Sequence, residues 1–294
     1  MVGNTINLHL KTPDNEATTD AKIIKVFEPF TLSSVMVVQI ACSDLGLEGD
    51  MVLKLFDRRF ATQLRSNEKC RPWDSDIERD YQQFVLNGGA SEFITEINNG
   101  GEIGQQGETW NASQDEAYLH DHLLDLYNTE VQVYDTVKDL QGKDIPKLLA
   151  CALAPGSSSA VLEPVSRGFP GLLIEYIPGI PLTDIADHIP RESWQGICED
   201  AIRILNLMGD RGILNEDVKT RSFIVNLEEG SRTKMIDFAL CKFREDYEDD
   251  DDWQGWKAIQ DEEGAIGRVM QDRLDGGFVY HRSDRWKRPA SLFE

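Results

Sequence analysis

The sequence lacks the features that mark membrane, secreted and zinc-binding proteins. No run approaches the roughly 18 apolar residues that a transmembrane helix needs, and the first 20 residues contain no apolar signal-peptide core. The five cysteines include no C-x-x-C pair, which indicates reduced thiols rather than a disulfide framework or a zinc site. We therefore expect a soluble intracellular protein, cytoplasmic or nuclear, with no membrane partner.

Positive charge is also scarce. The chain has 30 Lys and Arg against 52 Asp and Glu, which gives a formal net charge of -22 and a pI near 4.6. Such a surface repels phosphate backbones and anionic lipids, so we expect no nucleic-acid partner. With 294 residues and 40% hydrophobic content, the chain can bury a full core, as one bilobal domain or as two small ones.

Two short strand-like runs, at 223–225 and 234–236, are the part of the sequence from which a function can be inferred. Asp217 precedes the pair and Asp237 follows it. A hairpin between them would bring both carboxylates to one end of the same small sheet. That arrangement suits a metal-bound polyphosphate, because one carboxylate can handle an acceptor hydroxyl while the other holds Mg²⁺.

The same stretch resembles the catalytic region of the protein-kinase-like superfamily. That superfamily carries H-R-D-x-K-x-x-N followed by D-F-G, and the corresponding residues here are NEDVKTRS at 215–222 and DFA at 237–239. The two Asp residues and the Lys match, whereas the His, Arg, Asn and Gly do not. In particular, the chain resembles the fungal protein-kinase-like proteins whose metal loop reads D-F-A-L, from about Ile23 to that loop.

This resemblance implies an α+β class and a bilobal protein-kinase-like fold. The small lobe would be an antiparallel sheet with a long helix, over 21–177, with an insertion at 57–111 and a flexible lead-in at 1–20. The large lobe, over 178–294, would be reduced and mostly helical, because only 55 residues follow Ala239.

In the small lobe, β-branched runs at 21–30, 33–41 and 51–56 predict three antiparallel strands. Lys54 points inward in this scheme and occupies the place of the superfamily lysine that contacts nucleotide phosphates; an edge-strand lysine facing solvent is the alternative. No glycine occurs between Ala21 and Asp44. The phosphate-binding glycine loop is therefore missing, and phosphate must be held more weakly or by other donors.

The strongest helical pattern runs from 112 to 141, with Ser113 as N-cap and Glu116 as its capping-box partner. In the superfamily the matching helix supplies a Glu that orients the strand lysine. We assign this role to Glu130, because Glu116 lies too far toward the N-terminus; a surface carboxylate is the alternative. The insertion at 57–111 is either a partner-binding or regulatory element or a solvated elaboration.

Residues 171–179 resemble the hinge between the two lobes of a kinase. The backbone around Glu175 and Ile177 would then hydrogen-bond adenine, although a buried strand that ends in a Pro-Gly turn explains the pattern equally well. Further along, we expect helices at 191–211 and 254–274 and a solvated acidic linker at 244–253.

Together these assignments describe an ATP- and Mg²⁺-dependent phosphotransferase that acts on a protein Ser/Thr or on an unknown small molecule. Asp217 would orient the acceptor hydroxyl, and Lys219 would neutralise charge on the transferring phosphoryl group. Asp237 would bind Mg²⁺, and Ser222 stands at the position of the second metal ligand. Lys54, held by Glu130, would contact the α- and β-phosphates.

Two other functions stay open at this point. A pseudokinase scaffold that binds nucleotide weakly or not at all would fit the missing glycine loop and the substitutions at Ser222 and Ala239. An acidic interaction module without nucleotide is the third interpretation. The phosphotransferase is favoured because the four charged residues of the expected nucleotide site are all present, and a scaffold does not need them.

Overall fold

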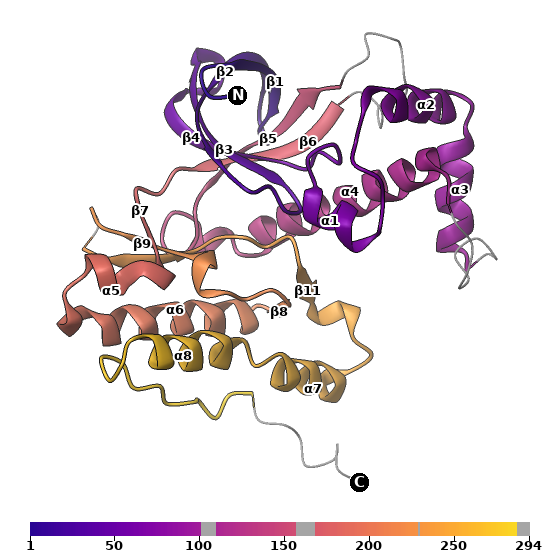
Figure 1. The fold of residues 1–294 in the computed structure, drawn as a ribbon. Coiled ribbons are helices and arrows are strands. Elements are labelled where there is room, and N and C mark those ends of the chain that lie inside the picture. The colour runs from indigo at the N-terminus through magenta and orange to yellow at the C-terminus, as the bar shows by residue number, and fades with distance from the viewer. Residues whose placement is uncertain (101–109, 157–167, 229, 287–294) are drawn as a thin grey trace. The chain divides into compact units, whose positions relative to one another are not determined.

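The protein is described here from a computed structural model, which covers residues 1–100, 110–156, 168–228 and 230–286 (Figure 1). The fold is α+β and has two compact units. Unit 1 comprises Met1–Asn128 and Leu148–Tyr176, and unit 2 comprises Thr129–Lys147 and Ile177–Glu294. No helix within the described ranges is both long and apolar enough to cross a membrane. The five cysteines are free thiols.

Unit 1 is built on a closed antiparallel barrel. Its strands follow one another around the barrel in the order β1 (Thr5–Lys11), β2 (Glu16–Phe27), β3 (Ser34–Cys42), β4 (Leu47–Leu55), β6 (Gly168–Glu175) and β5 (Leu148–Pro155). The barrel closes where β5 pairs with β1, from His9 opposite Leu153 to Lys11 opposite Cys151.

The predicted bilobal protein-kinase-like fold is therefore wrong. It required a small lobe made of an antiparallel sheet, whereas the strands of unit 1 close into a six-stranded barrel. The closure depends on β1 and the start of β2, which lie within the residues expected to be a flexible lead-in, so that prediction is wrong as well. Only Leu8 and Leu10 of β1 are fully buried. This alternation of apolar and polar residues is too short to predict a strand from the sequence.

The interior of the barrel is filled by side chains from all six strands, as in other small barrels. Small residues line β5, where alternate positions are alanine, and larger aliphatic residues occupy the strands around it. The buried residues of this core are Leu8, Leu10, Ala21, Ile23, Met36, Val38, Ile40, Cys42, Met51, Leu53, Leu55, Ala150, Ala152, Ala154 and Leu173.

The insertion at 57–111 is folded in the part that the structure describes, which leaves out 101–109. It contains α1 (Thr62–Asn67), α2 (Ser75–Leu86) and α3 (Gly89–Asn98), and it leads into the long helix α4 (Ala112–Thr136). Tyr81 of α2, Phe93 of α3 and Ala117 of α4 form one apolar cluster. The described insertion is thus packed against α4, and the interpretation as a solvated elaboration is wrong.

Buried charges also join the insertion to α4. The Arg65 guanidinium donates two hydrogen bonds to the Glu116 carboxylate, at 2.6 and 2.8 Å. Arg58 lies 3.3 Å from the same carboxylate and donates to Glu78 at 2.7 Å. All four side chains are buried. Removing one member would leave an opposite charge uncompensated in a low-dielectric site, so these residues fix the insertion to the helix.

The N-terminus of α4 is capped differently from the prediction. The side-chain oxygen of Asn111 accepts hydrogen bonds from the backbone N–H groups of Ser113 and Gln114, at 2.9 and 3.0 Å. The Gln114 side chain accepts from the Asn111 N–H in return, at 2.9 Å. This is a capping box two residues earlier than expected. Glu116 is free of the cap and turns to the buried arginines.

Unit 2 combines helices with two small sheets. Its helices are α5 (Ile185–His188), α6 (Trp194–Gly209), α7 (Asp250–Gln260) and α8 (Glu262–Arg273). One sheet has the order β10 (Arg232–Met235), β9 (Phe223–Asn226) and β7 (Gly179–Pro181), and the other pairs β11 (Cys241–Phe243) with β8 (Ile213–Asn215). The antiparallel pairing of β9 with β10 confirms the predicted hairpin.

The acidic run at 244–253, predicted to be a solvated linker, instead starts α7. The Asp249 side chain caps the helix by accepting a hydrogen bond from the Asp252 N–H at 2.8 Å. Carboxylates in the first turn are favourable there, because the helix N-terminus carries partial positive charge. Asp261, with φ of 47°, separates α7 from α8, so the single helix expected at 254–274 is two helices.

Candidate functional site

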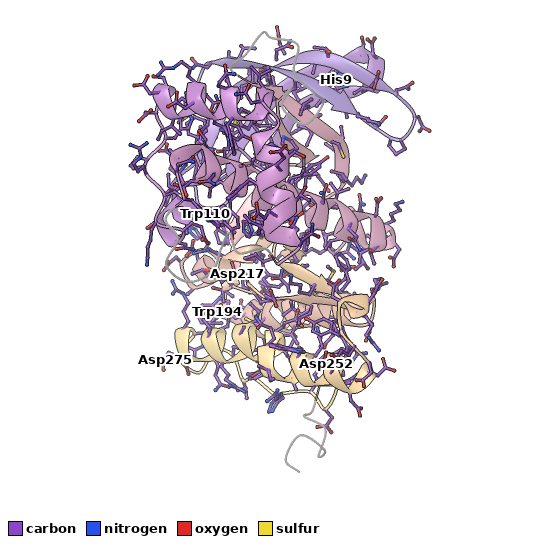
Figure 2. The ribbon with its side chains drawn as sticks, turned by 90° about the vertical axis from the view of Figure 1, so that its right-hand side faces the viewer. His9, Trp110, Trp194, Asp217, Asp252 and Asp275 are labelled. Atoms are coloured by element: carbon purple, nitrogen blue, oxygen red, sulfur yellow. The ribbon has the colours of Figure 1, made fainter. Side chains whose placement is uncertain are left out.

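Two loops of unit 2 carry the residues predicted to act in catalysis. Asp217, which is labelled in Figure 2, follows β8, and Asp237 lies between β10 and β11. The backbone joins these loops at two points, because the Glu216 N–H donates to the Leu240 carbonyl at 3.0 Å and the Ile236 N–H donates to the Ser222 carbonyl at 2.8 Å. The structure thus brings the two loops together at one end of the β9–β10 hairpin.

Asn215 links the two loops through its side chain. Its amide oxygen accepts a hydrogen bond from the Asp217 N–H at 2.8 Å, and its amide nitrogen donates to the Asp237 carbonyl at 3.0 Å. The residue is 3% exposed, so both bonds are shielded from water. Local side-chain bonds of this kind are typical of Asn in turns. Here the bond reaches a second loop as well, and fixes both aspartates relative to β8.

Asp217 and Lys219 form an ion pair, with the ammonium 2.5 Å from one carboxylate oxygen and 2.7 Å from the other. Both side chains are partly exposed, at 34% for Asp217 and 44% for Lys219. A ligand can therefore reach either group. The ion pair orients the Asp217 carboxylate, and the partly exposed ammonium can still contact an incoming anion.

Asp237 has a φ of 75°, in the left-handed region, which few residues other than glycine adopt and which Asn, Asp and His adopt most often among them. The hydrogen bond from Asn215 to its carbonyl and the bond from Ile236 to Ser222 hold the backbone in this conformation. Its side chain is exposed, while Ser222 is buried beneath the loop. Strained backbone of this kind occurs frequently at ligand sites, which makes Asp237 a candidate ligand-binding residue.

Glu130 is buried in α4, within the part of the helix that belongs to unit 2. Burial raises the pKa of the Cys241 thiol well above its usual value, and the negative charges of Glu262, Glu130 and Asp237 raise it further. The charges of these three carboxylates therefore act on one buried thiol of β11. Tyr134, one turn after Glu130, packs edge-on against Phe238, with ring centroids 5.5 Å apart.

A second support for the Asp217 loop comes from α8. The Glu262 carboxylate accepts a hydrogen bond from the Asn215 N–H at 2.8 Å and is ion-paired with Lys257 of α7. Both side chains are buried. Burial raises the pKa of the Glu262 carboxyl, while the Lys257 charge and the hydrogen bonds oppose that rise. Sequence reasoning missed this pair and Asn215, because no spacing in the sequence relates α8 to β8.

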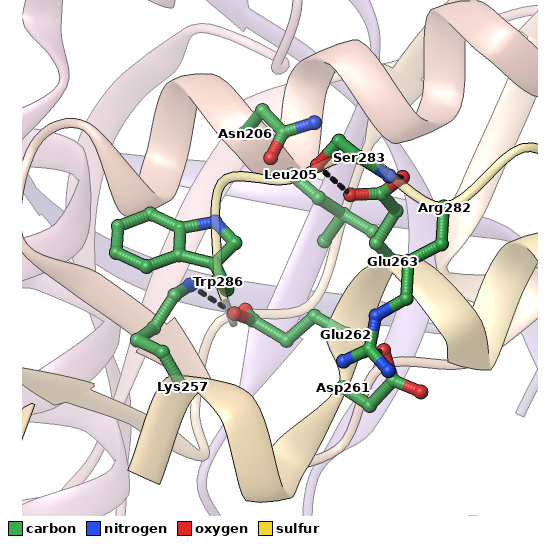
Figure 3. Close-up of a pocket in the computed structure, with 9 residues that line it drawn as sticks. All are labelled: Leu205, Asn206, Lys257, Asp261, Glu262, Glu263, Arg282, Ser283 and Trp286. Carbon is green, nitrogen blue, oxygen red and sulfur yellow. Dashed lines mark hydrogen bonds and ion pairs between the residues drawn. The ribbon is translucent and has the colours of Figure 1, made fainter. Parts of the chain in front are cut away.

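Figure 3 shows the cavity around this pair. Its volume is about 10 Å³, enough for one water molecule at most, so it is not a ligand pocket. The C-terminal segment covers it, since Ser283 donates to the Glu263 carboxylate at 2.6 Å and Arg282 lies 3.1 Å from Asp261. A larger hollow of about 620 Å³ lies on the outside of strands β1 to β3 and is open to solvent. It contains none of the predicted site residues.

Lys54 and Glu175 belong to unit 1. Lys54 is on β4 and is buried, but its neighbours Leu53 and Leu55 fill the barrel, so Lys54 lies on the opposite face of the strand. Its ammonium lies 5.6 Å from the Phe56 ring. The predicted burial of Lys54 is confirmed, although it lies outside the barrel interior, and the solvent-facing alternative is wrong. Glu175 ends β6 opposite Met51 of β4.

Ile177 is the first residue of this segment that belongs to unit 2, and it is buried. The change of unit thus falls within the residues that resemble a hinge. The structure brings Asp217, Lys219, Ser222, Asp237 and Glu130 into one unit. The assignment of Lys54, Glu175 and Ile177 to nucleotide contacts stays a prediction.

The donor set around Asp237 can be compared with what metal ions require. Within the described ranges, no three His, Cys, Asp or Glu side chains form a group suited to a metal ion. Mg²⁺ has a different requirement, since it commonly takes one or two carboxylates and completes its shell with water and substrate phosphates. The exposed Asp237 carboxylate fits that case.

No family model matches the chain, and neither does any curated protein.

Proposed function

We propose that the protein is an ATP- and Mg²⁺-dependent phosphotransferase, acting inside the cell on a protein Ser/Thr or on a small molecule. The observation that carries this proposal is the double hydrogen bond of Asn215, which ties the loop of Asp217 to the loop of Asp237. Transfer of a phosphoryl group is mainly a matter of positioning and of charge stabilisation, and two fixed, exposed carboxylate loops can supply both.

In this proposal each charged residue has one task. Asp217 accepts a hydrogen bond from the acceptor hydroxyl and orients it. Lys219, already paired with Asp217, lies near enough to counter negative charge on the transferring group. Asp237 and the Ser222 hydroxyl are the protein oxygens that would hold Mg²⁺, with nucleotide phosphates as further ligands. When bound, the ion neutralises charge on the phosphates.

The order of charged residues along the chain also supports the proposal, since it resembles that of protein-kinase-like proteins even though the fold does not. Lys54 and Glu130 are both buried, and buried charges are kept in proteins chiefly where they are paired or have a role. The roles of Lys54 and Glu130 at the nucleotide phosphates, and of the backbone near Glu175 and Ile177 at adenine, stay predictions from the sequence.

Thermal unfolding with ATP alone, Mg²⁺ alone and both together tests nucleotide binding, because a ligand that binds only the native state raises the melting temperature. Phosphate release then tests chemistry in three variants. Asp217→Asn and Asp237→Asn should each lower the rate by at least about a hundredfold, whereas Asp187→Asn, an exposed aspartate on α5, should leave it unchanged. Binding without turnover would favour a nucleotide-binding scaffold, and no stabilisation by ATP would refute both.

A further inference from the structure

An aromatic surface surrounded by carboxylates lies on unit 2, over α7 and the segment that precedes it. Trp256 and Ile259 are 46% and 52% exposed, and their spacing of three places them side by side on the helix. The Tyr247 ring lies 6.5 Å from that of Trp256 and 5.2 Å from that of the buried Trp253. We call this group the acidic aromatic surface; it comprises Tyr247, Trp256 and Ile259 with the exposed acids Glu245, Glu248 and Asp251.

The charge of this surface is strongly one-sided. Residues 244–252 contain seven acidic side chains and a single basic one, Arg244, which is paired with Asp250 at 2.6 Å. Several of the acids are used in local structure, such as the Asp249 cap. The side chains of Glu245, Glu248 and Asp251 have no hydrogen bond or ion pair to any residue that the structure describes, and all three are exposed.

The acidic aromatic surface adjoins the loop that carries Asp217. Gln260, the last residue of α7, donates a hydrogen bond to the Glu216 carbonyl at 2.7 Å. Burial raises the pKa of Tyr247 to about 12, and the negative charge of Glu216 is the next largest contribution. A segment bound on this surface would therefore lie beside the candidate site.

We propose that the acidic aromatic surface binds a Lys- or Arg-rich segment of a partner protein, with one cationic side chain stacked on Trp256. Cations are attracted to the face of an indole, and the surrounding carboxylates add charge complementarity. Anionic partners are repelled, and so is a second copy of a chain whose net charge is -22. This binding does not depend on phosphoryl transfer. If the proposed function holds, it would bring a basic acceptor protein to Asp217.

Fluorescence anisotropy with a labelled peptide of alternating Arg and Gly tests the proposal on the full chain. The native protein should bind this peptide and should not bind the same peptide with Glu in place of Arg. Trp256→Ala should weaken binding by about tenfold through the lost cation–π contact. The triple variant Glu245→Gln, Glu248→Gln, Asp251→Asn should also weaken it by about tenfold and reduce its salt dependence.

A matched control separates this surface from the general attraction of an acidic protein. Glu48→Gln, Glu92→Gln and Glu96→Gln remove the same amount of charge from exposed positions of unit 1. This control should bind the Arg peptide within about twofold of the native protein. Equal weakening in both triple variants, or unchanged binding in Trp256→Ala, would overturn the proposal. Phosphate release by each variant in the absence of peptide reports on the proposed function separately.

Discussion

Replacing Asn215 with alanine removes the one side chain that joins the two aspartate loops. Two hydrogen bonds are lost, one to the Asp217 N–H and one to the Asp237 carbonyl, and each leaves a backbone group without this partner. Each lost hydrogen bond costs about 1–2 kcal/mol, so the free energy of unfolding of the variant should be about 2–4 kcal/mol lower than that of the native protein. A typical domain has a stability of about 5–15 kcal/mol, so the variant should stay folded at room temperature.

The assay combines urea unfolding with ATP hydrolysis measured well below the melting temperature. Hydrolysis should fall by about a hundredfold in Asn215→Ala, because a shift of about 1 Å in either carboxylate is enough to disturb the reaction geometry. Asn226→Ala is the matched control. Asn226 is equally buried, and its side chain accepts a hydrogen bond from the Glu228 N–H at 2.9 Å, at the opposite end of β9 from Ser222. A folded Asn215→Ala that hydrolyses ATP as fast as Asn226→Ala would refute the reasoning.

Three further predictions concern stability. Burial and the Arg58 charge lower the pKa of His120 to about 4. Because the pKa in the unfolded chain is near 6.5, the free energy of unfolding should fall by at most about 3 kcal/mol as the pH drops from 6.5 to 4. His120→Gln should remove this pH dependence in urea titrations. Arg65→Met should lower the free energy of unfolding in urea by about 3 kcal/mol, because the buried Glu116 carboxylate loses the guanidinium that donates two hydrogen bonds to it. Gly267→Ala should lower the melting temperature, because its Cβ would lie 2.2 Å from the Tyr280 ring.

The Arg65 and Gly267 predictions each have a control in the same chain. Arg79→Met removes an exposed arginine of α2 and should change stability by less than about 0.5 kcal/mol. Gly196→Ala adds a Cβ to helix α6 that meets nothing within 4 Å, so it should raise stability by about 0.5–1 kcal/mol. The Arg65 prediction would be contradicted if Arg65→Met were as stable as Arg79→Met. The Gly267 prediction would be contradicted if Gly267→Ala gained stability. The His120 prediction would be contradicted if His120→Gln kept the pH dependence of the native protein.

Local patterns in the sequence predicted local structure well. The runs around Phe223 and Met235 form the expected hairpin, and three β-branched runs form β2 to β4 with shifted ends. The sequence also predicted that the loops of Asp217 and Asp237 lie together, because a hairpin fixes the geometry of its two ends. What failed was long-range pairing. Closure of the barrel rests on β1 and β5, which are more than a hundred residues apart.

Two further errors share one physical cause, which is that a polar side chain can be stabilised by several different partners. The acids before α7 are suited equally to a solvated linker and to a helix N-terminus. Glu116 has the spacing of a capping-box residue, yet it pairs with Arg65 and Arg58 instead. Lys54 was correctly predicted to be buried, but residues 53–56 are all buried, so alternation could not show which face of the strand it occupies. Only tertiary contacts decide between such alternatives.

The most direct test of the account is calorimetric titration of ATP into the native protein and into Asp237→Asn, each with and without MgCl₂. The account predicts that Mg²⁺ strengthens ATP binding to the native protein by at least about tenfold, and that Asp237→Asn loses most of this gain because its metal ligand is gone. ATP binding that does not respond to Mg²⁺, or an equal response in both proteins, would contradict the claim that Asp237 holds the metal-bound nucleotide.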